Sequence, residues 1–158
     1  MKNENKKWFL EAEKVAQDGL CARAKCGVVI VSRNGQLIGR GYNAPPKDDL
    51  ANAKCRAEFD HTKKSKYDIT CCVHAEWRAI ADALATHSDE ITGSSLYYVR
   101  LGDDGKLRHS GEPFCTVCSR FALDRGIAKF GLWHESGIVM YDAQDYNERS
   151  YSYHTPAA

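Results

Sequence analysis

The sequence predicts an α/β protein in which a mixed sheet of about five strands lies between layers of helices, a three-layer α/β/α fold. Segments with helical periodicity alternate with short apolar segments that suit strands. An Asn-Gly pair between the first two strand segments is typical of a tight hairpin turn. With 158 residues, 43% of them hydrophobic, the chain has the size and apolar content of one domain, which we expect to span residues 1–158.

Residues 5–18 predict the first helix. Apolar residues recur there at helical spacing, Glu and Lys lie between them, and Gly19 is a residue type that commonly ends a helix. The apolar positions at this spacing are Trp8, Ala12 and Val15. We expect Trp8 to lie in the core, and Trp133 as well.

A β-hairpin follows this helix. The run Cys26–Ser32 is short, continuously apolar and β-branched, which favours a strand that is covered on both faces. Leu37–Asn43 is the expected antiparallel partner. Gly39 and Gly41 leave room in it for another backbone or a ligand to approach closely.

Residues 44–72 predict a long irregular loop, and loops of this length are commonly functional or clipped by a metal. The basic run 63–66 is interpreted as solvated, with contact to phosphate as the alternative. Val73–His87 then returns to helical periodicity, so His74 and Glu76 fall in the first turn of a helix.

The second half of the chain continues the alternation of strands and helices. A turn at 103–105 opens an excursion to Gly111, which lengthens the path between a strand and the following helix. The expected elements are a strand at Leu96–Leu101, a helix at Cys115–Arg125 ended by Gly126, strands at Ile127–Trp133 and Ile138–Tyr141, and a helical turn at Ala143–Arg149.

Charge and cysteine content narrow the classes of function. The net charge is +1, whereas proteins that bind long polynucleotides usually carry a strong basic excess, so we expect no nucleic-acid partner. No apolar run approaches the roughly 18 residues that a membrane span needs. Seven cysteines are an odd number, and no apolar secretory segment precedes them, so free thiols in a reducing cytoplasm are the expectation.

Four residues have the chemistry of a catalytic zinc site. His74, Cys115 and Cys118 offer one imidazole and two thiolates, and three protein donors leave a fourth position open for water. Glu76, two residues after the histidine, can carry protons without being a ligand. The alternative is a core histidine, two buried thiols and a glutamate that stabilises a helix start.

Five motifs in this order resemble the zinc-dependent cytidine and deoxycytidylate deaminase family, closest to its dCMP deaminase branch. The resemblance covers roughly residues 20–133. The motifs are Cys21-Ala-Arg-Ala-Lys-Cys-Gly-Val-Val-Ile-Val31, Gly41-Tyr-Asn-Ala-Pro45, Cys72-Val-His-Ala-Glu76, Leu96-Tyr-Tyr98 and Cys115-Thr-Val-Cys118. A single one of them would be weak evidence, but together they predict the fold and the zinc chemistry.

The resemblance implies hydrolytic deamination of a small cytosine nucleotide, most simply dCMP to dUMP with release of ammonia. Zinc would make water a nucleophile near neutral pH, and Glu76 would carry protons to the ring and to the leaving ammonia. The backbone N–H of Ala75 and the side chain of Asn43 match residues that bind substrate in the family. For Asn43 the alternative is a turn residue that bonds its own backbone.

The chain departs from the family pattern at four places near the expected pocket. They are Phe114 between Pro113 and Cys115, Ala44 after the Gly-Tyr-Asn motif, Trp77-Arg78 after Glu76, and the excursion 103–111. Arg78 lies one turn beyond His74 and must meet a carboxylate, such as Asp82 or one from a neighbouring segment, or an anionic group of the ligand. If Arg78 is structural, the phosphate partner is to be sought among Arg23, Lys25 and Arg100.

Further alternatives stay open at this point. The chain could deaminate a nucleoside, a free base or another amino-heterocycle, or it could hold zinc only structurally and bind a nucleotide or partner. Some relatives hold a second zinc, for which the candidates here are Cys55, His61, Cys71 and Cys72, although their spacing fits no regular ligand motif. The resemblance also implies a homo-oligomer.

Overall fold

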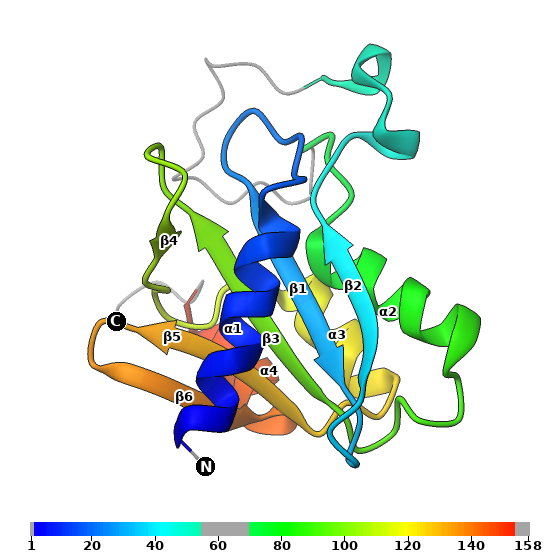
Figure 1. The fold of residues 1–158 in the computed structure, drawn as a ribbon, viewed down its shortest axis with the longest axis vertical. Coiled ribbons are helices and arrows are strands. Elements are labelled where there is room, and N and C mark those ends of the chain that lie inside the picture. Colours follow the sequence, from blue (N-terminus) through cyan, green and yellow to red (C-terminus); the bar gives the residue numbers. More distant parts are fainter. Residues whose placement is uncertain (1, 55–69, 154–158) are drawn as a thin grey trace.

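The computed structural model of the chain describes residues 2–54 and 70–153. Its centre is a mixed sheet with the strand order β2-β1-β3-β5-β6, and the short β4 pairs with β3 (Figure 1). The strands are β1 (Cys26–Val31), β2 (Leu37–Tyr42), β3 (Ser95–Leu101), β4 (Leu107–Arg108), β5 (Lys129–His134) and β6 (Gly137–Asp142). The helices are α1 (Lys2–Ala16), α2 (Ala75–Thr86), α3 (Thr116–Asp124) and α4 (Ala143–Ser152).

The strand directions explain why both donor-bearing segments lie at one end of the sheet. β1 is antiparallel to β2 and to β3, β3 is parallel to β5, and β5 is antiparallel to β6. The segment after β2 leads to α2, and the segment after β3 leads through β4 to α3. Because β2 and β3 point the same way, the two connections leave the sheet at the same end.

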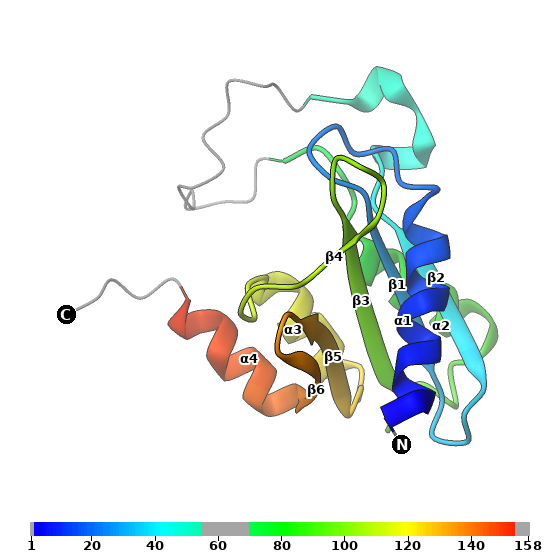
Figure 2. The same ribbon diagram turned by 60° about the vertical axis from the view of Figure 1, so that its left-hand side comes forward.

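Helices cover the two faces of the sheet, as predicted. Figure 2 shows α1 on one face and α3 and α4 on the other. The core under α1 is built around Phe9 and Val29, and the core under the other helices around Ile30, Ile80 and Phe130. No helix in the described part of the chain is long and apolar enough to cross a membrane.

Gly27, Gly39 and Gly41 let helices approach the sheet closely. A Cβ atom on Gly41 of β2 would collide with the carbonyl oxygen of Ala75, and one on Gly27 of β1 would collide with that of Ala12. The close approach expected at Gly41 is therefore made by the backbone of α2. This contact sets the first turn of α2 directly over the end of β2.

The structure corrects several expected boundaries. α2 begins at Ala75, so His74 is the residue before the first turn and not within it, and α3 likewise begins after Cys115. The excursion at 103–111 contains β4, which was not expected, and α4 is a ten-residue helix where one turn was predicted.

The long loop is less irregular in its described parts than the sequence suggests. It holds two short 3₁₀ turns at Pro46–Asp48 and Leu50–Asn52, and a bridge between Ala44 and Val73. The second-zinc candidates Cys55 and His61 and the basic run 63–66 lie outside the described residues.

Candidate metal centre and its surroundings

His74, Cys115 and Cys118 form one compact group of metal-donor atoms. His74 Nδ1 lies 3.1 Å from Cys118 Sγ and 3.6 Å from Cys115 Sγ, and the two sulfur atoms are 2.7 Å apart. All three donors lie within 4.8 Å of one another, and they are the one such group within residues 2–54 and 70–153. The donors that the sequence predicted therefore meet in space.

Two helix starts bring the donors together. His74 precedes the first residue of α2, and Cys115 precedes that of α3, where its sulfur accepts the backbone N–H of Cys118 at 3.3 Å. Backbone N–H groups at a helix N-terminus are unpaired and favour negative charge. The cysteines are thus placed where thiolates are stabilised.

The two thiols have opposite pKa shifts. The hydrogen bond between the two sulfur atoms lowers the pKa of Cys115 to about 5, with a further contribution from His74. Burial raises the pKa of Cys118, and its contact with Cys115 raises it further. One thiolate is therefore present near neutral pH. A soft donor set of one imidazole and two sulfurs at one point fits zinc.

The imidazole of His74 lies flat against the indole of Trp77. The ring centroids are 4.2 Å apart and the planes differ by 8°. Trp77 also lines an apolar groove of about 430 Å³ between α2 and α3. The residues lining this groove are Val73, Trp77, Arg78, Ala81, Val117 and Phe121. Trp77 therefore contacts both His74 and the groove.

Glu76 is a buried carboxyl beside the donor group. Its side chain belongs to the first turn of α2 and is 6% exposed. Burial raises its pKa to about 7, and the nearby charge of Cys115 adds to that shift, while His74 opposes it. A carboxyl with a pKa near neutrality can both accept and donate a proton.

The two expected substrate contacts lie close to this carboxyl in the chain. Ala75 is buried, and its carbonyl rests on Gly41. The side chain of Asn43 accepts the backbone N–H of Cys26 at 2.8 Å and donates to the carbonyl of Ala24 at 2.8 Å. It thus ties the chain before β1 to the end of β2, and a substrate contact for Asn43 stays a prediction.

Arg78 is paired within the protein. Its guanidinium donates to Asp48 Oδ1 at 2.8 Å and to the carbonyl of Pro45 at 3.2 Å, and it lies over the ring of Tyr42. The carboxylate partner thus comes from a neighbouring segment. Asp82, the partner named from the sequence, accepts the backbone N–H of Arg40.

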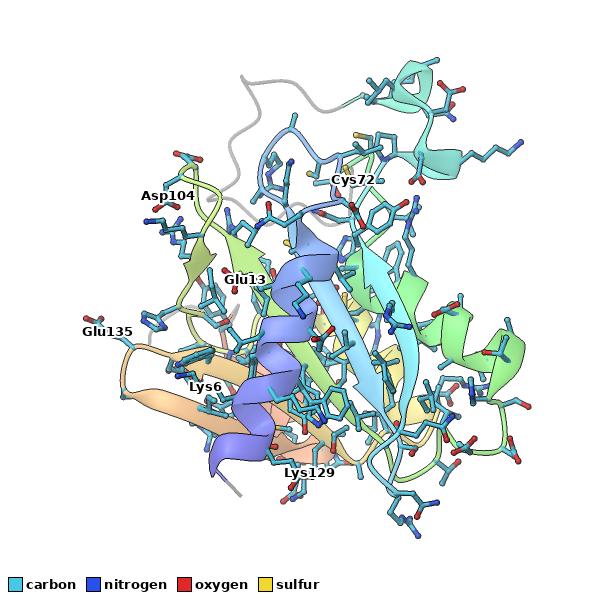
Figure 3. The ribbon with its side chains drawn as sticks, in the orientation of Figure 1. Lys6, Glu13, Cys72, Asp104, Lys129 and Glu135 are labelled. Carbon is cyan, nitrogen blue, oxygen red and sulfur yellow. The ribbon has the colours of Figure 1, made fainter. Side chains whose placement is uncertain are left out.

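Cys71 and Cys72, two candidates for a second zinc, lie with a third thiol that the sequence analysis did not include. Their sulfur atoms are 4.0 Å apart, and Cys72 is also hydrogen-bonded to Cys21. Burial raises the pKa of Cys72, and the two neighbouring thiols raise it further. Cys72 lies at the end of the sheet where β2 ends (Figure 3). A second zinc remains a prediction.

Tyr98 and Cys26 form a polar contact that no sequence pattern indicated. The hydroxyl of Tyr98 lies 3.2 Å from Cys26 Sγ, on the sheet face that packs against α2. Burial raises the pKa of Cys26 to about 11, and the charge of Glu76 contributes to that shift. Because strands β1 and β3 are far apart in sequence, only the register of the sheet reveals this pair.

The C-terminal helix supports the segment before Cys115. Tyr146 of α4 stacks on Phe130 with centroids 3.8 Å apart, and its hydroxyl is hydrogen-bonded to the backbone of Phe114. Ser119 of α3 is buried and bonds Ser150 of α4 at 3.0 Å. This packing explains why α4 is longer than its own sequence predicts.

Comparison with protein families gives one match over most of the chain. The family described as the cytidine and deoxycytidylate deaminase zinc-binding region matches residues 2–132. No individually curated protein matches the chain.

Solved structures with similar folds include two from a cyanophage and one from a bacterium. The dCMP deaminase of cyanophage S-TIM5 in apo form has a TM-score of 0.55 and 22% identity, covering 82% of each chain. The same enzyme in complex with dCMP and dUMP has a TM-score of 0.55 and 26% identity, covering 82% of this chain and 81% of that chain. The cytidine deaminase of Burkholderia pseudomallei has a TM-score of 0.59 and 16% identity, covering 89% and 94%.

Proposed function

The chain belongs to the cytidine and deoxycytidylate deaminase family, and from this membership we propose that it converts dCMP to dUMP and ammonia. It is a zinc-dependent hydrolytic deaminase. The observation that carries the proposal is the buried carboxyl of Glu76 beside the donor group His74, Cys115 and Cys118. A purely structural zinc site has no use for an acid of raised pKa at that place, which argues against a non-enzymatic binding module.

His74, Cys115 and Cys118 would hold the zinc ion. Two thiolates and one imidazole fit its preference for sulfur and nitrogen donors, and three protein donors are the number found in catalytic sites. When bound, zinc supplies the Lewis acidity that makes water a nucleophile near neutral pH.

Glu76 would carry protons through the reaction. It takes a proton from the attacking water and delivers it to ring nitrogen N3, so that the carbon bearing the exocyclic amine becomes tetrahedral. It then takes the proton of the new hydroxyl group and gives it to the exocyclic amine, so that the C–N bond breaks, ammonia leaves and a carbonyl remains. A pKa of about 7 suits a group that accepts and donates in one cycle.

The substrate assignment rests on the family and on the relatives. A dCMP deaminase solved with dCMP and dUMP has a similar fold, and we place the pyrimidine of this chain's substrate against the N–H of Ala75 and near Asn43. The second candidate is deamination of a nucleoside, which the fold likeness to a cytidine deaminase favours. We further propose a homo-oligomer located in the cytoplasm, where its free thiols remain reduced.

The experiment is a panel of cytosine, cytidine, deoxycytidine, CMP and dCMP assayed for ammonia release by the zinc-loaded protein. We expect the highest kcat/KM for dCMP. A preference for cytosine, cytidine or deoxycytidine would exclude a nucleotide as the substrate but would still support a deaminase. No ammonia from any compound, with zinc bound, would exclude both.

A further inference from the structure

Two arginines face each other across β3 and β4. Arg100 and Arg108 are directly paired in the antiparallel register, and both side chains are exposed. Their neighbours Leu101 and Leu107 pack into the core under α1. Because successive side chains of a strand point to opposite faces, both arginines project on the face that carries α2 and the donor group.

The register places this pair in line with Cys26, which is close enough to Glu76 for the carboxylate charge to raise the thiol pKa. Cys26 of β1 pairs with Arg100, and Asn43 is bonded to Cys26, so one row of side chains runs Asn43, Cys26, Arg100, Arg108 across the sheet. The adjacent row on the same face runs Gly41, Val28, Tyr98.

The first turn of α2 lies over that adjacent row. Ala75 rests on Gly41, and Glu76 follows it in the chain. Rows two residues apart along a strand are about 7 Å apart. The row that contains Arg100 and Arg108 is therefore the neighbour of the row that lies under the first turn of α2. The turn after β3, marked by Asp104 in Figure 3, lies at this same end of the sheet.

The charges of the arginines are unbalanced. Within residues 2–54 and 70–153, neither guanidinium makes an ion pair. Like charges directly opposite each other on neighbouring strands destabilise the pairing. Burial raises the pKa of Cys26 and of Tyr98, and the charge of Arg100 opposes this rise while that of Glu76 adds to it, so Arg100 and Glu76 act on the same two side chains.

We propose that Arg100 and Arg108 form an anion subsite that binds the 5′-phosphate of a nucleotide whose base lies at Glu76. The proposal rests on the proposed function, because it assumes a cytosine nucleotide as substrate. Planar guanidinium groups bind phosphate through two parallel hydrogen bonds, and a dianion between them offsets their mutual repulsion. The excursion at 103–111 then contributes to substrate binding, because its strand β4 supplies Arg108.

Other basic residues near this end fit the role less well. Lys25 uses its backbone carbonyl to bond Leu101, and its ammonium lies 3.4 Å from the carbonyl of Gln17. Arg78 is paired with Asp48. Among the described residues, Arg100 and Arg108 are two cations without an ion pair that lie in register with Cys26.

The test compares Arg100→Gln and Arg108→Gln with the matched control Arg40→Gln. Arg40 is also an exposed strand arginine, but it pairs with Val29, whose side chain belongs to the core on the opposite face. Each change removes one positive charge. We expect each test variant to lose about tenfold or more in kcat/KM for dCMP, mainly through KM, and less than about twofold for deoxycytidine.

The control should stay within about twofold of wild type for both compounds. Equal losses for dCMP and deoxycytidine, or no loss in either test variant, would overturn the proposal. Inorganic phosphate should inhibit dCMP turnover competitively, whereas non-competitive inhibition would indicate a separate anion site and count against it.

A binding measurement keeps the proposal testable without turnover. Inorganic phosphate should raise the melting temperature of wild type and of Arg40→Gln but not of the Arg100→Gln, Arg108→Gln double variant. If phosphate still raises the melting temperature of the double variant, the subsite proposal is wrong, even if the protein deaminates dCMP. If instead no cytosine compound is deaminated but the rise is lost in the double variant, the proposed function fails and the subsite stands.

Discussion

The ring of His74 stacks on the ring of Trp77, three residues later in the chain, with the planes 8° apart. The stack orients the imidazole so that Nδ1 faces the two sulfur atoms at 3.1 and 3.6 Å. A ligand held in place before the metal arrives loses less freedom on binding it.

Trp77→Leu should therefore weaken zinc binding by about twofold to tenfold, the scale of one aromatic stack, while Trp77→Phe should keep most of it. Competition with a chromophoric chelator measures the affinity, and the absorption spectrum of the cobalt-substituted protein reports ligand geometry. Val117→Ala, which alters the same groove and leaves both rings of the stack unchanged, is the control. Equal weakening by the control would show that general packing is responsible.

The number of zinc ions tests the donor assignment. We expect about one zinc per chain by elemental analysis, and its loss in Cys115→Ala and in Cys118→Ala, because each change leaves two donors. Full retention in both variants would rule out this ligand set. A content near two would point to a second site, with Cys71 and Cys72 as the first residues to change.

Glu76→Gln should retain zinc and lower kcat by about 10²- to 10⁴-fold, because the amide cannot accept the proton from water or return it. Product affinity, measured by calorimetry with dUMP, should change less than kcat. The residue is 6% exposed and the substitution preserves its size, so the fold should survive. Turnover like that of wild type would assign the proton transfers to another group.

The donor group could be predicted because its signals are local. A histidine and two cysteines at the starts of helical segments are visible in spacing and periodicity, and the structure brings them together as expected. The close approach at Gly41 was equally visible, because a glycine within a strand marks a place where something comes near.

The features that could not be predicted depend on contacts between distant segments. Arg78 meets Asp48, which has φ +58°, because an unusual turn after Pro46 presents that carboxylate. β4 is two residues long, too short for any periodicity, and is defined by its pairing with β3. The contact of Cys26 with Tyr98 follows from strand register, which the sequence does not encode locally.

The half-buried thiol of Cys26 should lower the free energy of unfolding in alkaline solution. Its pKa is about 11 in the folded chain against 9.0 for an unperturbed thiol, so between these values the folded state holds a proton that the unfolded state has lost. The free energy of unfolding then decreases as pH rises from 9 to 11, by up to about 2 kcal/mol.

Urea unfolding of wild type and Cys26→Ser under reducing conditions measures this. The serine keeps a hydroxyl near Tyr98 but does not titrate, so the decrease should be smaller in the variant by about that amount. Parallel pH profiles for the two proteins would contradict the assignment.

Arg78 should act through the fold and not through the phosphate. Its guanidinium donates hydrogen bonds to Asp48 and to the carbonyl of Pro45, and it lies over the ring of Tyr42. These contacts within the protein already satisfy its charge. Arg78→Asn should then lower kcat/KM for dCMP and for deoxycytidine by the same factor, within about twofold, because the segment after β2 loses its anchor to α2.

Asp48→Asn should reproduce this result, since it breaks the same contact from the other side. Asp82→Asn, an exposed change on the same helix without a bond to Arg78, is the control. The loss in melting temperature should be small for the test variants, because partly exposed ion pairs contribute little to stability. A different result would assign phosphate binding to Arg78: a loss of tenfold or more in kcat/KM for dCMP, with kcat/KM for deoxycytidine unchanged. Only a residue that touches the phosphate discriminates between these two compounds.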